Sequence, residues 1–390
     1  MKKYTSKRAR EIYDMYARDV SSEELQRLFT HDTRDAYRFF TSGVDEDSFA
    51  KLPWWQRAPE RVRLIFVAFT LRLPPARRAL YLTSLLIALI GVVKLFRGFG
   101  AVDFPLGLPF VRIAVGMPVW ADGTVALILS VLLLNLLVLL EVADRLSLKG
   151  ELEVAREIQM AMLPSGTYRS ADIEICGVTR PANTVGGDFY DVLPMPDGRV
   201  IVTLGDVAGK GSPAALLMAL LLAVLRTLVD EALESRALMA RLNAQICRHS
   251  PASRFITLFY AMYSPSTGQL TYVNAGQTPP LLRRLDGRYE RLNGTGVALG
   301  MFDGSTYESV NTHLAPGDAL VMYSDGITEA EDPSGRPFEE AGLEQLVTTH
   351  ANVPAAEMGV AVLKAVEQHT RQSRFVDDLT ILILKRHSAP

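Results

Sequence analysis

The chain is poor in cysteine and almost without net charge, and both shortages exclude classes of protein. Its 390 residues contain only Cys176 and Cys247, too few and too isolated for a disulfide framework or a zinc knuckle. The 41 lysines and arginines nearly balance the 43 aspartates and glutamates, and a net charge of -2 creates no field that attracts nucleic acid. We therefore expect a protein of a reducing compartment that binds no nucleic acid.

A cleaved signal peptide is not expected either. The N-terminal region is polar and includes the acidic pair Glu23-Glu24, which does not fit an apolar leader. Residues 1–75 instead suggest a small helical segment in the cytoplasm.

Two long apolar runs follow this segment, at 79–93 and 125–140. With their flanks, each approaches the roughly 20 residues that a helix needs to cross a bilayer. The sequence therefore predicts a membrane region, 76–143, with two transmembrane helices at about 79–97 and 123–141. A pair of buried core helices is the alternative.

The basic residues beside these runs are unevenly distributed. Arg77 and Arg78 precede the first run and Arg145 follows the second, whereas the segment between the runs contains only Lys94, Arg97 and Arg112. By the positive-inside rule, both ends of the chain should lie in the cytoplasm. We expect a multi-pass protein of the inner (cytoplasmic) membrane whose connecting segment is too short for a separate sensor domain.

A charged helix is predicted after the second run, within a linker at 144–165. Four apolar residues approximate a heptad seam, namely Leu148, Leu152, Ala155 and Met162. Such a helix could form a homodimer with a second copy. The alternative is a solvated connector, because the repeat is brief and Gln159 occupies one seam position.

Residues 166–390 have the pattern of a compact mixed domain, with apolar strand-like runs separated by turn signals. The predicted strands are 173–178, 200–204, 256–263, 270–274, 319–323 and 379–385. The predicted helices are 214–228, 339–350 and 355–372. The first of these helices is apolar enough to suggest a third membrane span, but its shortness favours a helix buried against a sheet.

Four short segments of this domain carry aspartate beside a strand-like run. They are 186–191, 204–211, 323–329 and 377–380. Asp206 and Asp325 each follow an apolar run and are next to glycine, whereas Asp377 precedes such a run. A single aspartate of this kind usually forms a turn. Several carboxylates at strand ends instead predict a site for a hard, oxygen-binding cation.

In order and spacing, these segments resemble the bacterial branch of the metal-dependent serine/threonine protein phosphatases. That branch includes the stage II sporulation phosphatase and the phosphatases of anti-anti-sigma factors. The resemblance covers roughly residues 150–387, and together its motifs are highly specific. The motifs are Glu153-Val154-Ala155-Arg156-Glu157-Ile158-Gln159, Gly186-Gly187-Asp188-Phe189-Tyr190-Asp191, Gly205-Asp206-Val207-Ala208-Gly209-Lys210-Gly211, Asn274-Ala275-Gly276, Tyr323-Ser324-Asp325-Gly326 and Asp377-Asp378-Leu379-Thr380.

The resemblance implies an α/β (α+β) domain, a PP2C-like β-sandwich flanked by helices, here preceded by an α-helical membrane hairpin. It also implies a centre of two Mn²⁺ or Mg²⁺ ions. Asp188 and Asp206 would be the catalytic carboxylates nearest both metals. The carbonyl of Val207, together with Asp325 and Asp377, would complete the metal ligands.

Two further aspartates, Asp191 and Asp378, are expected to support the site. The chain departs from the family at two positions: Gln277 stands where histidine is common, and Glu339 replaces the glycine of a Phe-Gly pair. Neither is an expected metal ligand, so these departures concern substrate contacts.

The resulting hypothesis is a membrane-anchored, metal-dependent protein serine/threonine phosphatase. Metal-bound hydroxide would attack the phosphoryl group of a regulatory phosphoprotein resembling an anti-anti-sigma factor. The alternative is a non-catalytic membrane adaptor that binds a regulator through a phosphatase-like domain. Metal-dependent nucleotide chemistry is a weaker rival, because the sequence has no P-loop.

Overall fold

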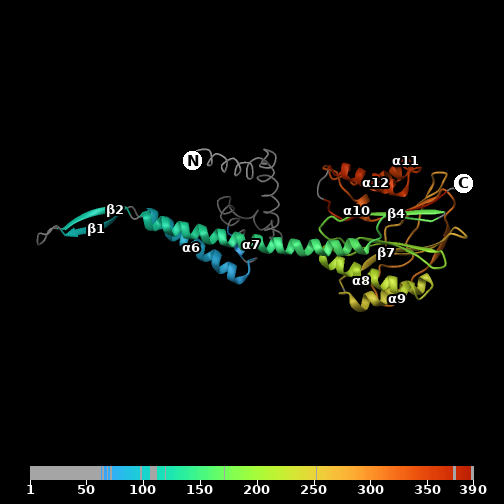
Figure 1. Ribbon diagram of the computed structural model, residues 1–390, viewed down its shortest axis with the longest axis horizontal. Coiled ribbons are helices and arrows are strands. Elements are labelled where there is room, and N and C mark those ends of the chain that lie inside the picture. The colour runs from blue at the N-terminus through green and yellow to red at the C-terminus, as the bar shows by residue number, and fades with distance from the viewer. Residues whose placement is uncertain are drawn as a thin grey trace, which may run out of the picture. The chain divides into compact units, whose positions relative to one another are not determined.

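The computed structural model describes the greater part of the chain (Figure 1). The described residues are 63, 66–67, 69–70, 73–96, 99–105, 112–118, 120–170, 172–251, 253–371 and 375–387. The chain divides into two compact units, Met1–Arg145 and Leu146–Pro390. The predicted cytoplasmic segment 1–75 lies almost wholly outside the described residues.

In the first unit, helix α6 (Pro75–Phe96) packs against the beginning of α7 (Trp120–Met162). A side chain added at Gly91 would come within 3.0 Å of the Gly123 carbonyl, and one at Gly123 within 2.9 Å of the Gly91 carbonyl. The hydroxyl of Ser130 donates to the carbonyl of Ser84 over 2.8 Å. Small residues and an interhelical hydrogen bond are typical of helix pairs inside membranes.

Strands β1 (Phe99–Pro105) and β2 (Arg112–Pro118) form an antiparallel hairpin between these helices. The segment expected as a plain connection therefore has regular structure of its own.

Three described helices are long and apolar enough to cross a membrane: α6, Gly123–Met162 of α7, and α8 (Ser212–Val229). The two predicted spans lie within the first two. The third candidate packs on strand β6 (Val200–Val207) and helix α9 (Ser235–His249) and buries a stripe that includes Leu217, Leu221 and Leu225. Its apolar residues thus pack in a protein core, as expected for a helix buried against a sheet.

Helix α7 continues without interruption from Trp120 to Met162. The second predicted span and the predicted linker helix are therefore one element. Beyond the apolar run, residues 142–151 are exposed, so packing does not hold this stretch of helix. Its continuity comes from good helix formers such as Leu146, Lys149 and Glu151.

The second unit contains two antiparallel sheets that form a sandwich (Figure 1). One sheet has the strand order β10-β9-β12-β13-β4-β3, and the other has the order β11-β8-β7-β6-β5. The strands are β3 (Thr167–Arg169), β4 (Ile173–Arg180), β5 (Phe189–Pro194), β6 (Val200–Val207), β7 (Ile256–Ser264), β8 (Gln269–Ala275), β9 (Leu281–Arg283), β10 (Tyr289–Arg291), β11 (Val310–His313), β12 (Ala319–Tyr323) and β13 (Leu379–Arg386).

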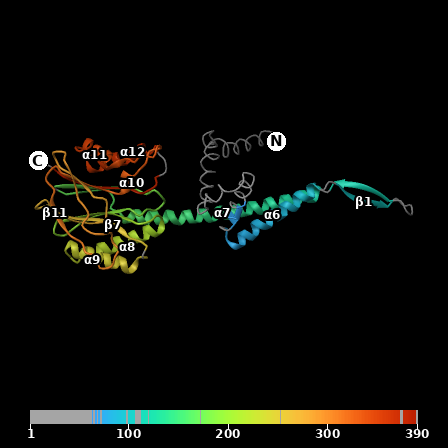
Figure 2. The ribbon, with the colours of Figure 1, turned by 180° about the vertical axis from the view of Figure 1, so that it is seen from behind.

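Helices cover the outer faces of both sheets (Figure 2). Helices α8 and α9 lie over the five-stranded sheet, and α12 lies over strands β4 and β13 of the other, with α11 beside it. These later helices are α9 (Ser235–His249), α10 (Asp325–Thr328), α11 (Glu339–Thr349) and α12 (Ala355–His369).

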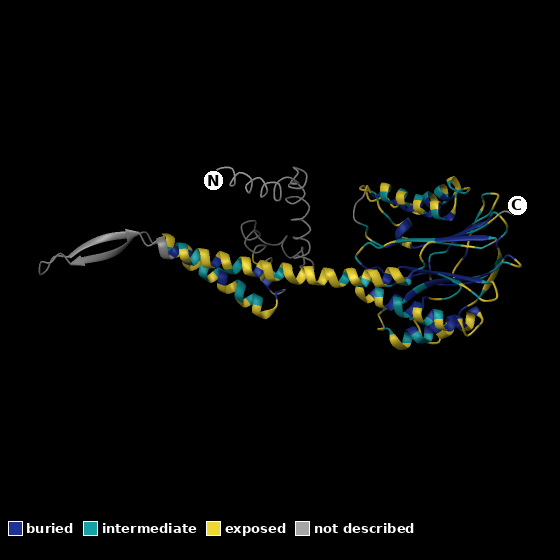
Figure 3. Cartoon of the chain, viewed as in Figure 1, coloured by how far each residue is buried: buried dark blue, intermediate teal, exposed yellow. Residues whose placement is uncertain are grey.

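The central strands are apolar on both faces because each face has a partner layer (Figure 3). On β13, Leu382 and Leu384 belong to the core between the sheets, whereas Ile381 and Ile383 belong to the cluster under α11 and α12. The period of two along a strand sends alternate side chains to opposite faces. A continuous apolar run therefore indicates a strand covered on both sides.

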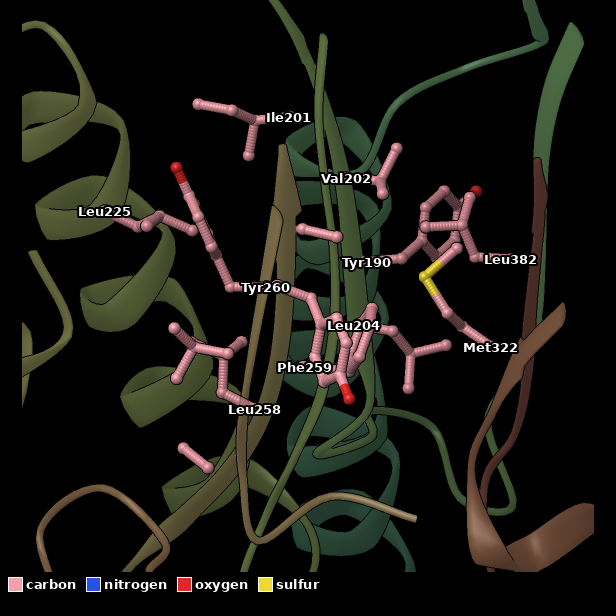
Figure 4. Packing of buried hydrophobic residues seen from close by; sticks show 14 of the residues in the cluster. Tyr190, Ile201, Val202, Leu204, Leu225, Leu258, Phe259, Tyr260, Met322 and Leu382 are labelled. Atoms are coloured by element: carbon pink, nitrogen blue, oxygen red, sulfur yellow. The ribbon is translucent and has the colours of Figure 1, made fainter. Parts of the chain in front are cut away.

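The same alternation holds for the other sheet (Figure 4). Tyr260 points toward Leu225 on α8, while its neighbour Phe259 points into the space between the sheets with Met322 and Leu382. At roughly 25 cal/mol per Å² of buried apolar surface, these interlayer contacts form the main favourable term in the stability of the domain.

One departure from the family pattern has a structural consequence at the start of α11. Glu339 has a φ of 62°, in the left-handed region that glycine adopts without steric cost. Its side chain is exposed, so packing offers no compensation for the strain.

We predict that E339G stabilises the second unit by about 1 kcal/mol, because it removes the steric cost of the left-handed conformation. The same exchange at Glu357 is the control, since this residue is exposed in the first turn of α12 and has no positive φ. E357G should cost about 1 kcal/mol by weakening helix propensity. Chemical denaturation of both variants measures the difference, and destabilisation by E339G would contradict the argument.

Candidate metal centre

Antiparallel pairing brings the four predicted segments to one region of the domain. Asp188 immediately precedes β5 and Asp206 lies near the end of β6, and these strands pair with Phe189 opposite Gly205. In the other sheet, Asp325 follows β12 and Asp377 precedes β13, and Tyr323 pairs with Ile381. Each sheet thus contributes two aspartates, because the end of one strand lies beside the start of its antiparallel neighbour.

Close approaches join the loops within each pair. A side chain on Gly187 would come within 2.9 Å of both Asp206 Oδ1 and the Val207 carbonyl oxygen. One on Gly326, next to Asp325, would meet the Asp378 carbonyl at 2.2 Å and the Asp377 Cβ at 3.3 Å. Glycine is thus required where these loops approach each other, and oxygen atoms converge on the space beside Gly187.

The aspartates repel one another. Burial, followed by the charge of Asp206, raises the pKa of Asp188 well above its ordinary value. Burial and the charges of Asp325, Asp377 and Asp378 raise the pKa of Asp206 to about 7. Burial and Asp377 also raise the pKa of Asp325. Such mutual destabilisation of the charged forms is the expected result of placing carboxylates together in a region of low polarity.

The side chain of Asp188 gives the clearest indication that the cluster binds a cation. Its side chain is 5% exposed, and its Oδ2 atom is buried with no hydrogen-bond partner among the described residues. Leaving a buried acceptor unpaired costs about 1–3 kcal/mol, and more for a charged group. A divalent cation would satisfy this oxygen, and carboxylates with a backbone carbonyl are the donors that Mg²⁺ and Mn²⁺ prefer.

The side chains of the cluster are not yet arranged to coordinate a metal ion. No group of three or more acidic, histidine or cysteine side chains among the described residues is arranged to hold a metal ion as it stands. Asp377 instead forms an ion pair with Lys210 over 3.0 Å. The residues nevertheless fit a metal, since the buried Oδ2 of Asp188 lacks a partner among the described residues, and Asp206 Oδ1 and the Val207 carbonyl oxygen both lie beside Gly187.

Asp378 contacts the backbone rather than the centre of the cluster. Its Oδ2 accepts hydrogen bonds from the backbone N–H groups of Gly187 and Asp188, over 2.7 Å and 3.4 Å. Its Oδ1 accepts one from Ala182 N–H over 2.8 Å. These bonds hold the loop that carries Asp188, and a supporting role of Asp378 in a metal site stays a prediction.

Asp191 lies on β5, 1% exposed, and faces a different partner. Its Oδ2 accepts a hydrogen bond from Arg226 Nε over 2.7 Å. Arg226 also donates to the carbonyl of Met162, at the end of α7, over 2.6 Å. Asp191 therefore supports the attachment of α7, through Arg226, and no hydrogen bond joins it to the other aspartates.

Gln277, which follows strand β8, is buried and only 6% exposed. Its side chain is hydrogen-bonded to Thr257, which pairs with Asp206 across β6 and β7. In this position it supports the strand of Asp206 and offers little surface to a substrate.

Sequence reasoning missed two residues that contact the site. Lys210 was noted only as part of a motif, yet it pairs with Asp377 and donates to the Val376 carbonyl. Gln159 was noted as the last residue of a motif and as a polar interruption of the seam, yet it also hydrogen-bonds the backbone of Gly186. The signal in the sequence was a polar residue, Gln159, at a seam position where the heptad pattern expects an apolar one.

The comparisons with known proteins agree with this geometry. Residues 196–387 match the family described as Stage II sporulation protein E (SpoIIE). The second unit belongs to this phosphatase family. The structure of the SiaA-PP2C domain of Pseudomonas aeruginosa shares its fold, with a TM-score of 0.54 and 23% identity over 62% of this chain and 98% of that one.

Two relatives share the same region of sequence. Phosphoserine phosphatase RsbU of Bacillus subtilis is 29% identical over 240 residues, which cover 61% of this chain and 71% of RsbU. Protein IcfG of Synechocystis sp. is 28% identical over 264 residues, which cover 61% of this chain and 42% of IcfG. The chain thus matches less than half the length of IcfG. The family and the mixed α/β sandwich predicted from the sequence are both confirmed, whereas the roles of individual residues stay predictions.

We predict that D378N and D377N have different effects on folding. D378N should destabilise the domain by about 2 kcal/mol, because an amide NH₂ would replace an oxygen that accepts backbone N–H groups. D377N should cost less than about 1 kcal/mol, because it removes only a half-exposed ion pair. Thermal unfolding in the presence of a metal chelator measures both effects. Equal losses of stability would contradict the supporting role of Asp378.

Proposed function

We propose that the chain is a metal-dependent protein phosphatase that removes phosphate from serine or threonine of a protein substrate. The buried, unpaired Oδ2 of Asp188 within a cluster of carboxylates carries this proposal. Membership of the SpoIIE family and similarity to phosphoserine phosphatase RsbU support it.

The proposed ligands have unequal roles. Asp188 and Asp206 lie at the centre and would contact both of two Mn²⁺ or Mg²⁺ ions, with the Val207 carbonyl beside them. Asp325 and Asp377 would hold one ion from the opposite sheet. A bound metal pair supplies an activated water and neutralises charge on the phosphoryl group. No protein nucleophile is needed for such chemistry.

The described residues prepare the site for this reaction. Backbone bonds to Asp378 hold the Asp188 loop in one conformation, so the carboxylate is in place before metal or substrate arrives. Lys210 balances part of the negative charge by pairing with Asp377. On metal binding, Lys210 would be released from this pair and become available to a phosphate group, for which lysine serves as a point charge.

We further propose that the substrate is a regulatory phosphoprotein resembling an anti-anti-sigma factor. The similarity to RsbU supports a phosphoserine protein as the substrate class. The near-neutral composition of the chain agrees with a protein substrate more than with nucleic acid.

The full chain, purified in detergent, should hydrolyse a phosphoserine peptide with Mn²⁺ or Mg²⁺ and lose the activity in EDTA. D206N should reduce kcat at least about 100-fold, because it removes a charged ligand at the centre of the cluster. Release of inorganic phosphate measures both effects.

D286N is a matched control, since Asp286 is exposed and pairs with Arg288 in a remote turn. It should leave the activity unchanged. Activity of D206N in EDTA would refute the proposed chemistry. Metal-independent binding of a phosphoprotein without turnover would favour the adaptor alternative.

We propose that α6 and the first part of α7 form a hairpin in the cytoplasmic membrane, with both ends of the chain in the cytoplasm. Their length, apolar composition and exposed apolar side chains, such as Leu86, Leu89 and Leu139, support this location.

A cysteine introduced at Gly107, between the two helices, should react in intact cells with a membrane-impermeant maleimide. Native Cys247, which is partly exposed in the second unit, serves as the internal control and should react only after the membrane is opened. Labelling of Cys247 in intact cells would refute the orientation.

We still propose a homodimer through residues 144–165, but through a different face of the helix from the predicted seam. Of the predicted seam, Met162 packs against the chain's own core and Gln159 is buried. Exposed Val154 and Ile158 lie on another face of α7 and are better placed to meet a second copy. Cross-linking of a cysteine introduced at position 154 would show whether they do.

A further inference from the structure

Gln159 is a buried polar residue on a helix whose apolar neighbours are exposed. Its side chain is 6% exposed, whereas Ile158 is 61% exposed and Met160 is 38% exposed. Burying a polar side chain and exposing the apolar ones is the reverse of ordinary core packing. At this position the orientation of α7 therefore brings an amide, and not one of the adjacent apolar side chains, against the domain.

The amide of Gln159 binds one residue at two points. Nε2 donates to the Gly186 carbonyl over 2.8 Å, and the Gly186 N–H donates to Oε1 over 3.1 Å. Nε2 also lies 3.3 Å from the sulfur of buried Met218. Glutamine provides both a donor and an acceptor, so it satisfies both backbone groups of Gly186 at once.

The contact lies at the beginning of the loop that carries Asp188. The next two N–H groups, those of Gly187 and Asp188, donate to Asp378. Three successive backbone N–H groups are thus held by two side chains, one from α7 and one from the turn before β13. With both partners in place, this loop can keep the carboxylate of Asp188 beside Asp206.

We propose that Gln159 is a positioning residue that fixes the 186–188 loop for metal binding by Asp188. The inference rests on the proposed metal role of Asp188. The contact between Gln159 and Gly186 also makes the site depend on the position of α7. A shift of one residue along a helix moves a side chain by about 1.5 Å and turns it by about 100°. Such a shift removes the amide from Gly186.

The test compares two variants in which methionine and glutamine are exchanged. Q159M has a side chain of similar length and removes both hydrogen bonds, while M160Q makes the reverse exchange at the exposed neighbour. Titration calorimetry of the full chain in detergent measures Mn²⁺ binding without substrate. We expect Q159M to weaken Mn²⁺ binding on the order of tenfold, as for other residues that orient metal ligands. M160Q should bind Mn²⁺ as the unaltered chain does.

Kinetics with the phosphoserine peptide give a second readout. Q159M should lower kcat at fixed Mn²⁺ and leave KM for the peptide unchanged, and excess Mn²⁺ should restore part of the loss. A merely structural role would lower the unfolding temperature without changing the Mn²⁺ affinity of the folded protein. That outcome, or equal Mn²⁺ binding by Q159M and M160Q, overturns the proposal.

Q159N provides an independent variant in case Q159M folds poorly. It keeps the amide but is one methylene too short to reach Gly186, so it should weaken Mn²⁺ binding as Q159M does, and unchanged binding would overturn the proposal. The same experiments distinguish a failure of the proposed function from a failure of the positioning role. If the unaltered chain binds Mn²⁺ but hydrolyses no phosphopeptide, the proposed function fails, while weaker binding by the variants still supports the positioning role.

Discussion

The repulsion between buried carboxylates is the constraint around which this domain is organised. Two aspartates from each sheet lie at one region of the sandwich, and burial together with the neighbouring carboxylates raises the pKa of Asp206 to about 7. Without compensating contacts, this arrangement would destabilise the folded state. Compensation comes from backbone N–H groups, from the ammonium group of Lys210 and, on the proposed function, from a divalent cation.

The need to bring these carboxylates together explains the local sequence. A side chain at Gly186 would come within 2.2 Å of Asp378 Oδ2, and one at Gly326 within 2.2 Å of the Asp378 carbonyl. Both glycines are therefore dictated by close approach to a single residue. Asp378 accepts hydrogen bonds from the N–H groups of Gly187 and Asp188, and this makes it a structural residue within a functional motif.

The sequence predicted those parts of the structure that depend on local pattern. Strand β12 has the predicted limits, 319–323, and β13 is one residue longer than predicted, because their alternating apolar residues meet two different layers. Strand β5 was missed because its buried Asp191 interrupts the apolar pattern, and the ion pair that compensates for this burial comes from the distant Arg226. Helix α9 was missed because its polar residues outweigh a narrow stripe that includes Leu238 and Leu242.

The attachment of α7 could not be derived from local pattern, since it depends on residues far apart in sequence. Arg226 binds the Met162 carbonyl, the hydroxyl of Tyr190 binds the Pro164 carbonyl, and Gln159 binds Gly186. All three contacts join the end of α7, or the residues just after it, to β5, to helix α8 or to the metal loop. Polar contacts are more directional than apolar packing, so they fix the register and rotation of a helix and not only its distance from the sheet. A helix that begins in a membrane-type apolar run and ends in such contacts has one preferred register, and that register includes the hydrogen bonds beside Asp188.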